Sequence, residues 1–206
     1  MSLKGKKIGF AVTGSHCTIS KVLPQIKKLI NEGAEVYPIL SPAVRDTDTR
    51  FGLGASWQAE LEALTGHQAI ATIVEAEPLG AQKLLDALII APCTGNTLAK
   101  LANGITDTPV LMAAKAVLRN QRPVIIGIST NDGLGANAKN LGLLLNTKNI
   151  YLVPFRQDDP YNKANSLIAD MDLILETTLA ALAGRQLQPL LLGPGGGGEK
   201  KESTNI

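Results

Sequence analysis

The chain has 206 residues, of which 45% are hydrophobic and 18% charged, and 20 Lys and Arg against 18 Asp and Glu give a formal net charge of +2. This length suits one α/β domain, and the small net charge, without a dense basic block, argues against nucleic-acid binding. The two cysteines, Cys17 and Cys93, lack metal-site or disulfide spacing, and the apolar run over 8–12 is too short for a signal peptide or a membrane span. We therefore expect a reduced, cytoplasmic setting and no metal site.

Short apolar runs alternate with helical segments along most of the chain. Strands are predicted over 8–12, 35–40, 69–74, 87–90, 123–128 and 150–154. Helices are predicted after the loop 13–18, over 56–64, near 82–85, and over 98–102, 107–118 and 136–145. This alternation predicts a three-layer, doubly wound, Rossmann-like parallel sheet in a single α/β domain.

The C-terminal part is predicted to be a long helix over 162–183, with an apolar face that includes Leu167, Met171 and Leu175. We interpret this face as core or as a subunit interface. The segment after it is rich in glycine and offers no apolar surface to bury. The domain is therefore expected over 1–190 and a disordered tail over 191–206.

Small polar residues follow the strand predicted over 87–90. Thr94, Asn96 and Thr97 lie there, and in open α/β sheets ligands bind outside the carboxyl ends of the strands. Ser129, Thr130 and Asn131 follow the strand over 123–128 in the same way. Local turn formation explains this Asn-Asp-Gly segment equally well, because these residues favour turns. The position of both loops makes a cofactor site the leading hypothesis.

The first loop, which contains Gly14, Ser15, His16 and Thr18, is neither a G-x-G-x-x-G nor a G-x-x-x-x-G-K-[ST] motif. The second strand ends at Ser41, without the acidic residue that binds the ribose of a nicotinamide dinucleotide. A hydroxyl-rich loop at a helix N-terminus suits a terminal phosphate such as that of FMN. The alternative is an ordinary strand-to-helix connection with a hydroxyl residue as N-cap.

Three segments carry a resemblance to a known family: 13–15, the motif Pro-x-x-x-Asn-Thr over 92–97, and Lys-Leu-Ala-Asn-Gly-Ile-x-Asp over 100–107. They resemble the flavoproteins that include phosphopantothenoylcysteine decarboxylase and lantibiotic peptidyl-cysteine decarboxylases. The resemblance implies a Rossmann-like fold, FMN bound at a subunit contact, and a homo-oligomer built from trimers. The residues expected to bind the cofactor are Gly14, Ser15, His16, Thr18, Ser41, Pro92, Thr94, Asn96, Thr97, Ser129, Thr130 and Asn131.

Two further segments, 129–140 and 153–160, resemble one branch of this family from spore-forming bacteria. The resemblance implies an oxidoreductase of the mother-cell cytoplasm during sporulation. Together with an NAD(P)-binding A subunit, it would oxidise dihydrodipicolinate to pyridine-2,6-dicarboxylate. The decarboxylases carry a Pro-Ala-Met-Asn-x-x-Met motif where this chain has 111–119, which argues against decarboxylation of cysteine. A non-catalytic scaffold subunit and a stand-alone FMN-dependent decarboxylase of a small acid are the alternatives.

Asn96 and His67 are the candidate catalytic residues. Asn96 matches the family position near flavin and substrate, and the decarboxylases use a histidine from a region similar to that of His67. A histidine at a helix end is explained equally well by the last carbonyls of the helix. Lys115 and Arg119, four residues apart on one helical face, suit a dicarboxylate substrate, although a solvated basic face has the same pattern. Neither cysteine is given a chemical role.

Overall fold

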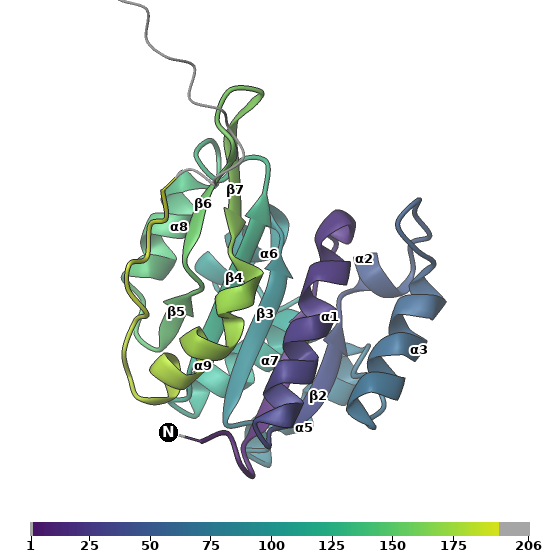
Figure 1. The fold of residues 1–206 in the computed structure, drawn as a ribbon. Helices are drawn as coiled ribbons and strands as arrows, with labels where there is room; N and C mark the ends of the chain where they lie inside the picture. Colours follow the sequence, from purple (N-terminus) through teal and green to yellow (C-terminus); the bar gives the residue numbers. More distant parts are fainter. Residues whose placement is uncertain (1, 194–206) are drawn as a thin grey trace, which may run out of the picture.

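Five parallel strands form most of the sheet in the computed structural model, which describes residues 2–193. The strand order is β2-β1-β3-β4-β7-β6, and β5 also pairs with β4 (Figure 1). The parallel strands are β1 (Lys7–Val12), β2 (Glu35–Leu40), β3 (Ala87–Cys93), β4 (Val124–Thr130) and β5 (Ile150–Leu152). Every residue of β3 is buried, as expected for a central parallel strand covered on both faces. The predicted α/β class and doubly wound parallel core are confirmed.

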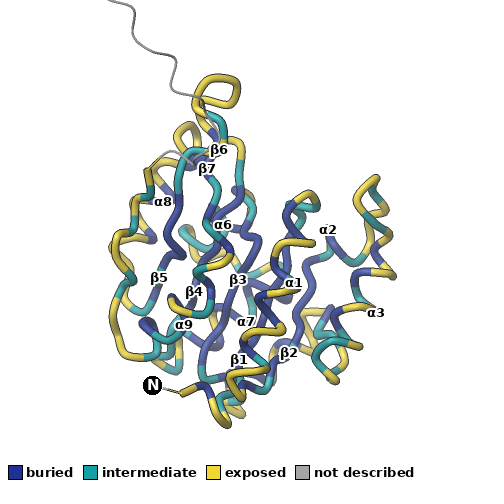
Figure 2. The backbone as a smooth tube through the Cα atoms, viewed as in Figure 1, coloured by how far each residue is buried: buried dark blue, intermediate teal, exposed yellow. Residues whose placement is uncertain are grey.

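Helices cover both faces of the sheet, and the buried residues follow the strands and the helix faces turned toward them (Figure 2). The apolar residues among them form one core. The helices α1 and α9 pack together over β3, while α7 packs on the sheet from the other side, with α6 and α8 beside it. The helices are α1 (His16–Asn31), α2 (Pro42–Arg45), α3 (Gly54–Thr65), α4 (Ile73–Ala76), α5 (Pro78–Ala81), α6 (Gly95–Ala102), α7 (Pro109–Arg119), α8 (Ala138–Leu145), the 3₁₀ helix η1 (Met171–Leu173) and α9 (Ile174–Leu182). Within residues 2–193, no helix is both long and apolar enough to cross a membrane.

The prediction of a strand over 69–74 is wrong. Only Ile70 pairs with the sheet, through an isolated bridge to Ile39, and the chain then turns into α4. The cause is a capping box, in which the Thr72 side chain accepts from the N–H of Glu75 and the Glu75 side chain accepts from the N–H of Thr72. The next helix, predicted near 82–85, is instead α5, with proline in its first turn.

The prediction of a helix over 162–183 is wrong for its first half. Residues 155–169 form an antiparallel hairpin of β6 (Phe155–Asp159) and β7 (Lys163–Ala169), and only η1 and α9 keep a helical conformation. The Asp159 carboxylate accepts from the N–H of Asn162 and so closes the hairpin turn. β7 pairs with the end of β4, so an antiparallel extension joins the parallel sheet and projects past its carboxyl edge (Figure 1).

The tail predicted over 191–206 lies outside the described residues from 194 onward. Its first residues are described, and they continue the sheet locally: Leu191 bridges to Phe155, and the N–H of Leu192 donates to the carbonyl of Phe155.

Candidate functional site

The polar loops predicted at the strand ends all leave the same edge of the sheet. The register pairs Val12 of β1 with Leu40 of β2 and Cys93 of β3 with Ile128 of β4. The residues that follow therefore stand in a row along the carboxyl edge. In the order of the strands, these are Ser41, Gly14 with Ser15, Thr94, and Ser129.

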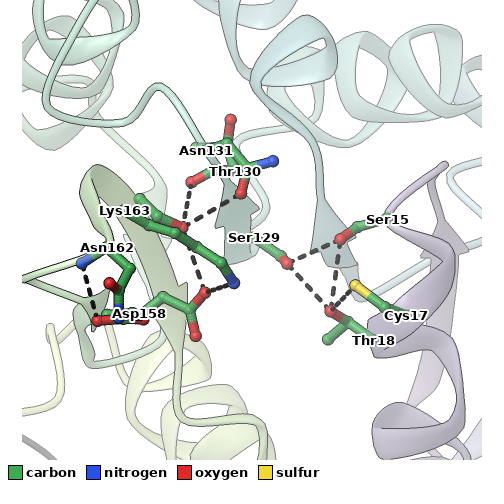
Figure 3. A network of polar contacts seen from close by, with 11 residues as sticks. Ser15, Cys17, Thr18, Ser129, Thr130, Asn131, Asp158, Asn162 and Lys163 are labelled. Carbon is green, nitrogen blue, oxygen red and sulfur yellow. Dashed lines mark hydrogen bonds and ion pairs between the residues drawn. The ribbon is translucent and has the colours of Figure 1, made fainter.

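Three hydroxyl groups meet between the start of α1 and the end of β4. Ser129 Oγ lies 2.8 Å from Ser15 Oγ and 3.1 Å from Thr18 Oγ1, although the residues are more than a hundred positions apart (Figure 3). Each hydroxyl donates one hydrogen bond and can accept two, so the three groups satisfy one another and still accept from a ligand. They also rotate, which allows their protons to turn toward an anion.

Two other polar atoms at this edge are buried and lack a partner among the described residues. They are Ser41 Oγ and His16 Nδ1. A buried polar group without a hydrogen bond costs about 1–3 kcal/mol, so these atoms suit a site that a ligand completes. Between their loops lies Gly14, at which an added Cβ would come 3.0 Å from the Cβ of Ala43. The N-terminus of α1, with no acidic residue in its first turn, adds a partial positive charge.

The turn between β3 and α6 is fixed by hydrogen bonds from both sides. Thr13 Oγ1 donates to the carbonyl of Pro92 at 2.7 Å and accepts from the N–H of Thr94 at 3.0 Å. Thr94 then caps α6 by accepting from the N–H of Thr97. Asn96 lies in the first turn of α6 and is exposed, so its amide is free to contact a ligand along the edge.

An amide and carboxylate network supports that turn from the other face of the sheet. The Asp132 carboxylate accepts from Thr130 Oγ1 and, at 2.8 Å, from Asn137 Nδ2. The network packs directly against α6, because a Cβ at Gly95 would lie only 2.5–2.6 Å from atoms of these three side chains. Thr130 therefore faces this network, while Ser129 faces the hydroxyl cluster.

The β6–β7 hairpin forms a wall opposite the start of α1. Asp158 and Lys163 make an ion pair of 2.8 Å there (Figure 3). Both side chains border a cavity of about 290 Å³ together with the hydroxyl cluster and Lys21. A wider groove of about 1060 Å³ shares Lys21 and Asp158 with this cavity and continues along α1. Sequence reasoning singled out Asp158 as a cap of the last helix or as a contact of a flavin edge or substrate ring nitrogen, but it missed Lys21 and Lys163, and it placed Lys163 on a helix where the structure has the hairpin.

His67, Lys115 and Arg119 are not brought to this edge within one chain. His67 stacks on Tyr37, with ring centroids 4.3 Å apart, and its Nε2 lies 3.4 Å from Glu35 at the amino end of β2. Lys115 and Arg119 are exposed on α7, whose last turn lies beside α5, since the side chain of the adjoining Asn120 donates to the carbonyl of Gly80. The three side chains therefore lie apart from Asn96 and the hydroxyl cluster.

Neither cysteine forms part of a reactive pair in the described residues. Cys93 is fully buried in β3, and this burial raises the pKa of its thiol to about 12, so it stays protonated at neutral pH. Cys17 is exposed beside the hydroxyl cluster, 3.7 Å from Thr18 Oγ1. Over residues 2–193, no group of three or more His, Cys, Asp or Glu side chains is arranged to hold a metal ion.

Comparison with known proteins places the chain in a family. Residues 1–156 match the family model described as Flavoprotein. The chain is 59% identical over 191 residues to the B subunit of dipicolinate synthase from Bacillus subtilis, covering 93% of this chain and 96% of that protein. The crystal structure of the corresponding B subunit from Bacillus halodurans is 49% identical, covers 94% of this chain and 99% of its own, and superposes with a TM-score of 0.86.

A more distant structure, the FMN-dependent cysteine decarboxylase SpaF, shares the fold. It is 21% identical, covers 88% of this chain and 99% of its own, and has a TM-score of 0.63. The resemblance read from the sequence motifs is thus confirmed. The chain belongs to the Flavoprotein family, in the branch of the dipicolinate synthase B subunits.

Proposed function

We propose that this chain is the FMN-binding subunit of a dipicolinate synthase, which acts with an NAD(P)-binding A subunit to oxidise dihydrodipicolinate to dipicolinate during sporulation. The 59% identity to the Bacillus subtilis B subunit supports the assignment to this enzyme. The observation that carries the cofactor proposal is the convergence of hydroxyls and unpartnered buried polar atoms along one sheet edge. The proposed setting is the mother-cell cytoplasm.

The residues at this edge fit a flavin mononucleotide. A phosphate monoester needs several donors around a small space, and the proposed donors come from the loop after β1 and from Ser41 after β2. Gly14 keeps the backbone open there because it has no Cβ. The proposed phosphate-binding residues are Gly14, Ser15, His16, Thr18 and Ser41; those proposed for the ring and its edge are Pro92, Thr94, Asn96, Thr97, Ser129, Thr130 and Asn131.

The reaction removes a hydride and a proton from a dihydropyridine ring, and the product is aromatic. When bound, FMN supplies a hydride acceptor. Asn96 would position a ring by hydrogen bonds, since its amide both donates and accepts and does not titrate. His67 lies at the opposite edge of its own chain, so a catalytic role for it requires a second protomer of a homo-oligomer. We propose that assembly, based on trimers, for this chain too.

The test of the cofactor proposal is FMN retention by the purified chain after desalting, read from the visible absorption spectrum. We expect about one flavin per chain, and much weaker retention by Ser15→Ala and Ser41→Ala, because each removes a phosphate donor. Ser20→Ala is the matched control: Ser20 is exposed on α1 and borders neither cavity. Riboflavin, which lacks the phosphate, should be retained less than FMN. Equal retention of both ligands, or by all variants, would contradict the assigned phosphate site.

A scaffold role is the second candidate, and one observation favours it. The hydroxyls of Ser15, Thr18 and Ser129 are hydrogen-bonded to one another, so they need no ligand to satisfy them. A scaffold would stimulate the A subunit equally with and without flavin. Stimulation that depends on FMN, and that is lost in Asn96→Ala, would exclude the scaffold role.

A further inference from the structure

The cavity between α1 and the β6–β7 hairpin has cationic side chains on two opposite walls. Lys21 comes from α1, and Lys163 comes from the start of β7. Ser129, at the end of β4, lies between the hairpin and the start of α1 (Figure 3), and Ser15 and Thr18, proposed above for the FMN phosphate, line the same cavity from the α1 side. The second wall of this cavity, with Lys163, therefore exists only when the hairpin is folded.

The two lysines differ in their partners. Lys163 lies 2.8 Å from the Asp158 carboxylate, and this contact raises the pKa of its ammonium group, so the group remains charged. One of its three N–H donors is used by Asp158, and two remain for a ligand. Lys21 makes no ion pair with any residue in 2–193, whereas the neighbouring Lys28 and Arg156 pair with Asp172 and Asp170. The two lysines and Asp158 together leave the cavity with one excess positive charge, and Lys21 is the cation without an ion-pair partner.

We propose that this cavity binds the dicarboxylate substrate, with Lys21 holding one carboxylate and Lys163 the other. The proposal rests on the proposed function and names the site at which that function's substrate would bind. The product, pyridine-2,6-dicarboxylate, is planar and carries one carboxylate on each side of the ring nitrogen, so two separate cationic side chains can each hold one of them. A compact ligand of this kind suits a cavity of about 290 Å³, and the groove along α1 gives it a path from solvent.

This substrate site differs from the one predicted from the sequence, which was formed by Lys115 and Arg119. Lys115 and Arg119 are exposed on α7, on the other side of the sheet from α1. Lys21 and Lys163, by contrast, lie beside Ser129 at the edge that is proposed to hold the cofactor. Asp158 is a positioning residue: it holds Lys163, and its own carboxylate, which also borders the cavity, repels an anion.

The test is binding of pyridine-2,6-dicarboxylate to the FMN-treated full chain, measured by titration calorimetry in metal-free buffer. We expect Lys21→Gln and Lys163→Gln each to weaken binding about tenfold or more, as loss of one charge-assisted contact predicts. Lys21→Arg should restore most of it. Lys27→Gln is the matched control, because Lys27 is exposed on the same helix and borders neither cavity. Circular dichroism of each variant establishes that it is folded.

Pyridine-2-carboxylate, with one carboxylate, provides a second readout. The wild-type chain should prefer the dicarboxylate, and either glutamine variant should lose most of that preference. Unchanged affinity in both folded lysine variants, or no binding of the dicarboxylate by the wild-type chain either alone or with the A subunit, would overturn the proposal. Flavin retention is measured on the same samples. Dicarboxylate binding that depends on the lysines, without flavin retention, supports this substrate site and contradicts the cofactor assignment. Flavin retention together with dicarboxylate binding that does not depend on the lysines supports the cofactor assignment and contradicts this substrate site.

Discussion

Replacing Gly95 by alanine tests whether the network around Asp132 rigidly supports the turn that carries Asn96. The new Cβ would lie 2.5 Å from Thr130 Oγ1 and 2.6 Å from both Asp132 Oδ1 and Asn137 Nδ2, which is too close for any of these atoms to stay in place. Hydrogen bonds to a charged group contribute about 1.5–3 kcal/mol each, and the substitution displaces one or both of those to Asp132. Because Gly95 is the first residue of α6, alanine offsets at most about 0.5–1 kcal/mol of this through helix propensity. We therefore expect the free energy of unfolding to fall by about 0.5–3 kcal/mol if one of these bonds is lost and by about 2–6 kcal/mol if both are lost.

The assay is urea unfolding followed by circular dichroism, with Gly142→Ala as the matched control. Gly142 also lies in a helix, α8, but nothing lies within 4 Å of its added Cβ, so this variant should gain about 0.5–1 kcal/mol. The contrast in sign between two glycine-to-alanine changes isolates the steric term. A Gly95→Ala chain as stable as the wild type would refute the idea that the network packs rigidly against α6.

Two further predictions concern ionisable groups. Hydrogen bonds from the backbone N–H groups of Ala71 and Thr72 lower the pKa of Glu75, so its stabilisation is present above the ordinary carboxyl pKa and is lost as pH falls through the lowered value. Glu75→Gln should lower the free energy of unfolding by about 0.5 kcal/mol at neutral pH, a small value because the side chain is exposed. The difference from the wild type should vanish in acid. The same difference in urea unfolding at neutral and at acidic pH would contradict this. A thiol reagent at neutral pH should label Cys17 alone in the folded chain and Cys93 only after unfolding, because Cys93 is buried with its pKa raised to about 12; labelling of both folded-state thiols, detected by mass spectrometry, would count against the buried assignment.

The sheet edge was predictable because parallel strands impose it. Once strands over 8–12, 87–90 and 123–128 are identified, the residues after each must lie at one edge, and Ser15 and Ser129 do meet there. The same reasoning applies to the helix ends. Since α3 and α7 run back from the carboxyl edge, residues after their last turns lie at the amino edge, which explains the position of His67 beside Glu35.

The hairpin was not predictable from periodicity. Leu167 and Met171 are spaced as on a helical face, and the same spacing is compatible with a strand followed by a 3₁₀ turn. Pairing of β7 with Ser129 and Thr130 decides in favour of the strand, and this contact joins residues far apart in the sequence. The positions of Lys163 and Asp158 depend on the hairpin, so the cavity was outside the reach of local sequence reasoning.

A reconstituted assay would show whether this chain contributes a flavin site to dipicolinate formation. Purified chain, stripped of flavin, would be mixed with the A subunit, NAD(P) and dihydrodipicolinate, and dipicolinate would be measured with and without added FMN. We predict that product formation requires both subunits, rises with FMN and falls in Asn96→Ala. Full activity without flavin, and the same rate in Asn96→Ala, would contradict a flavin site in this chain.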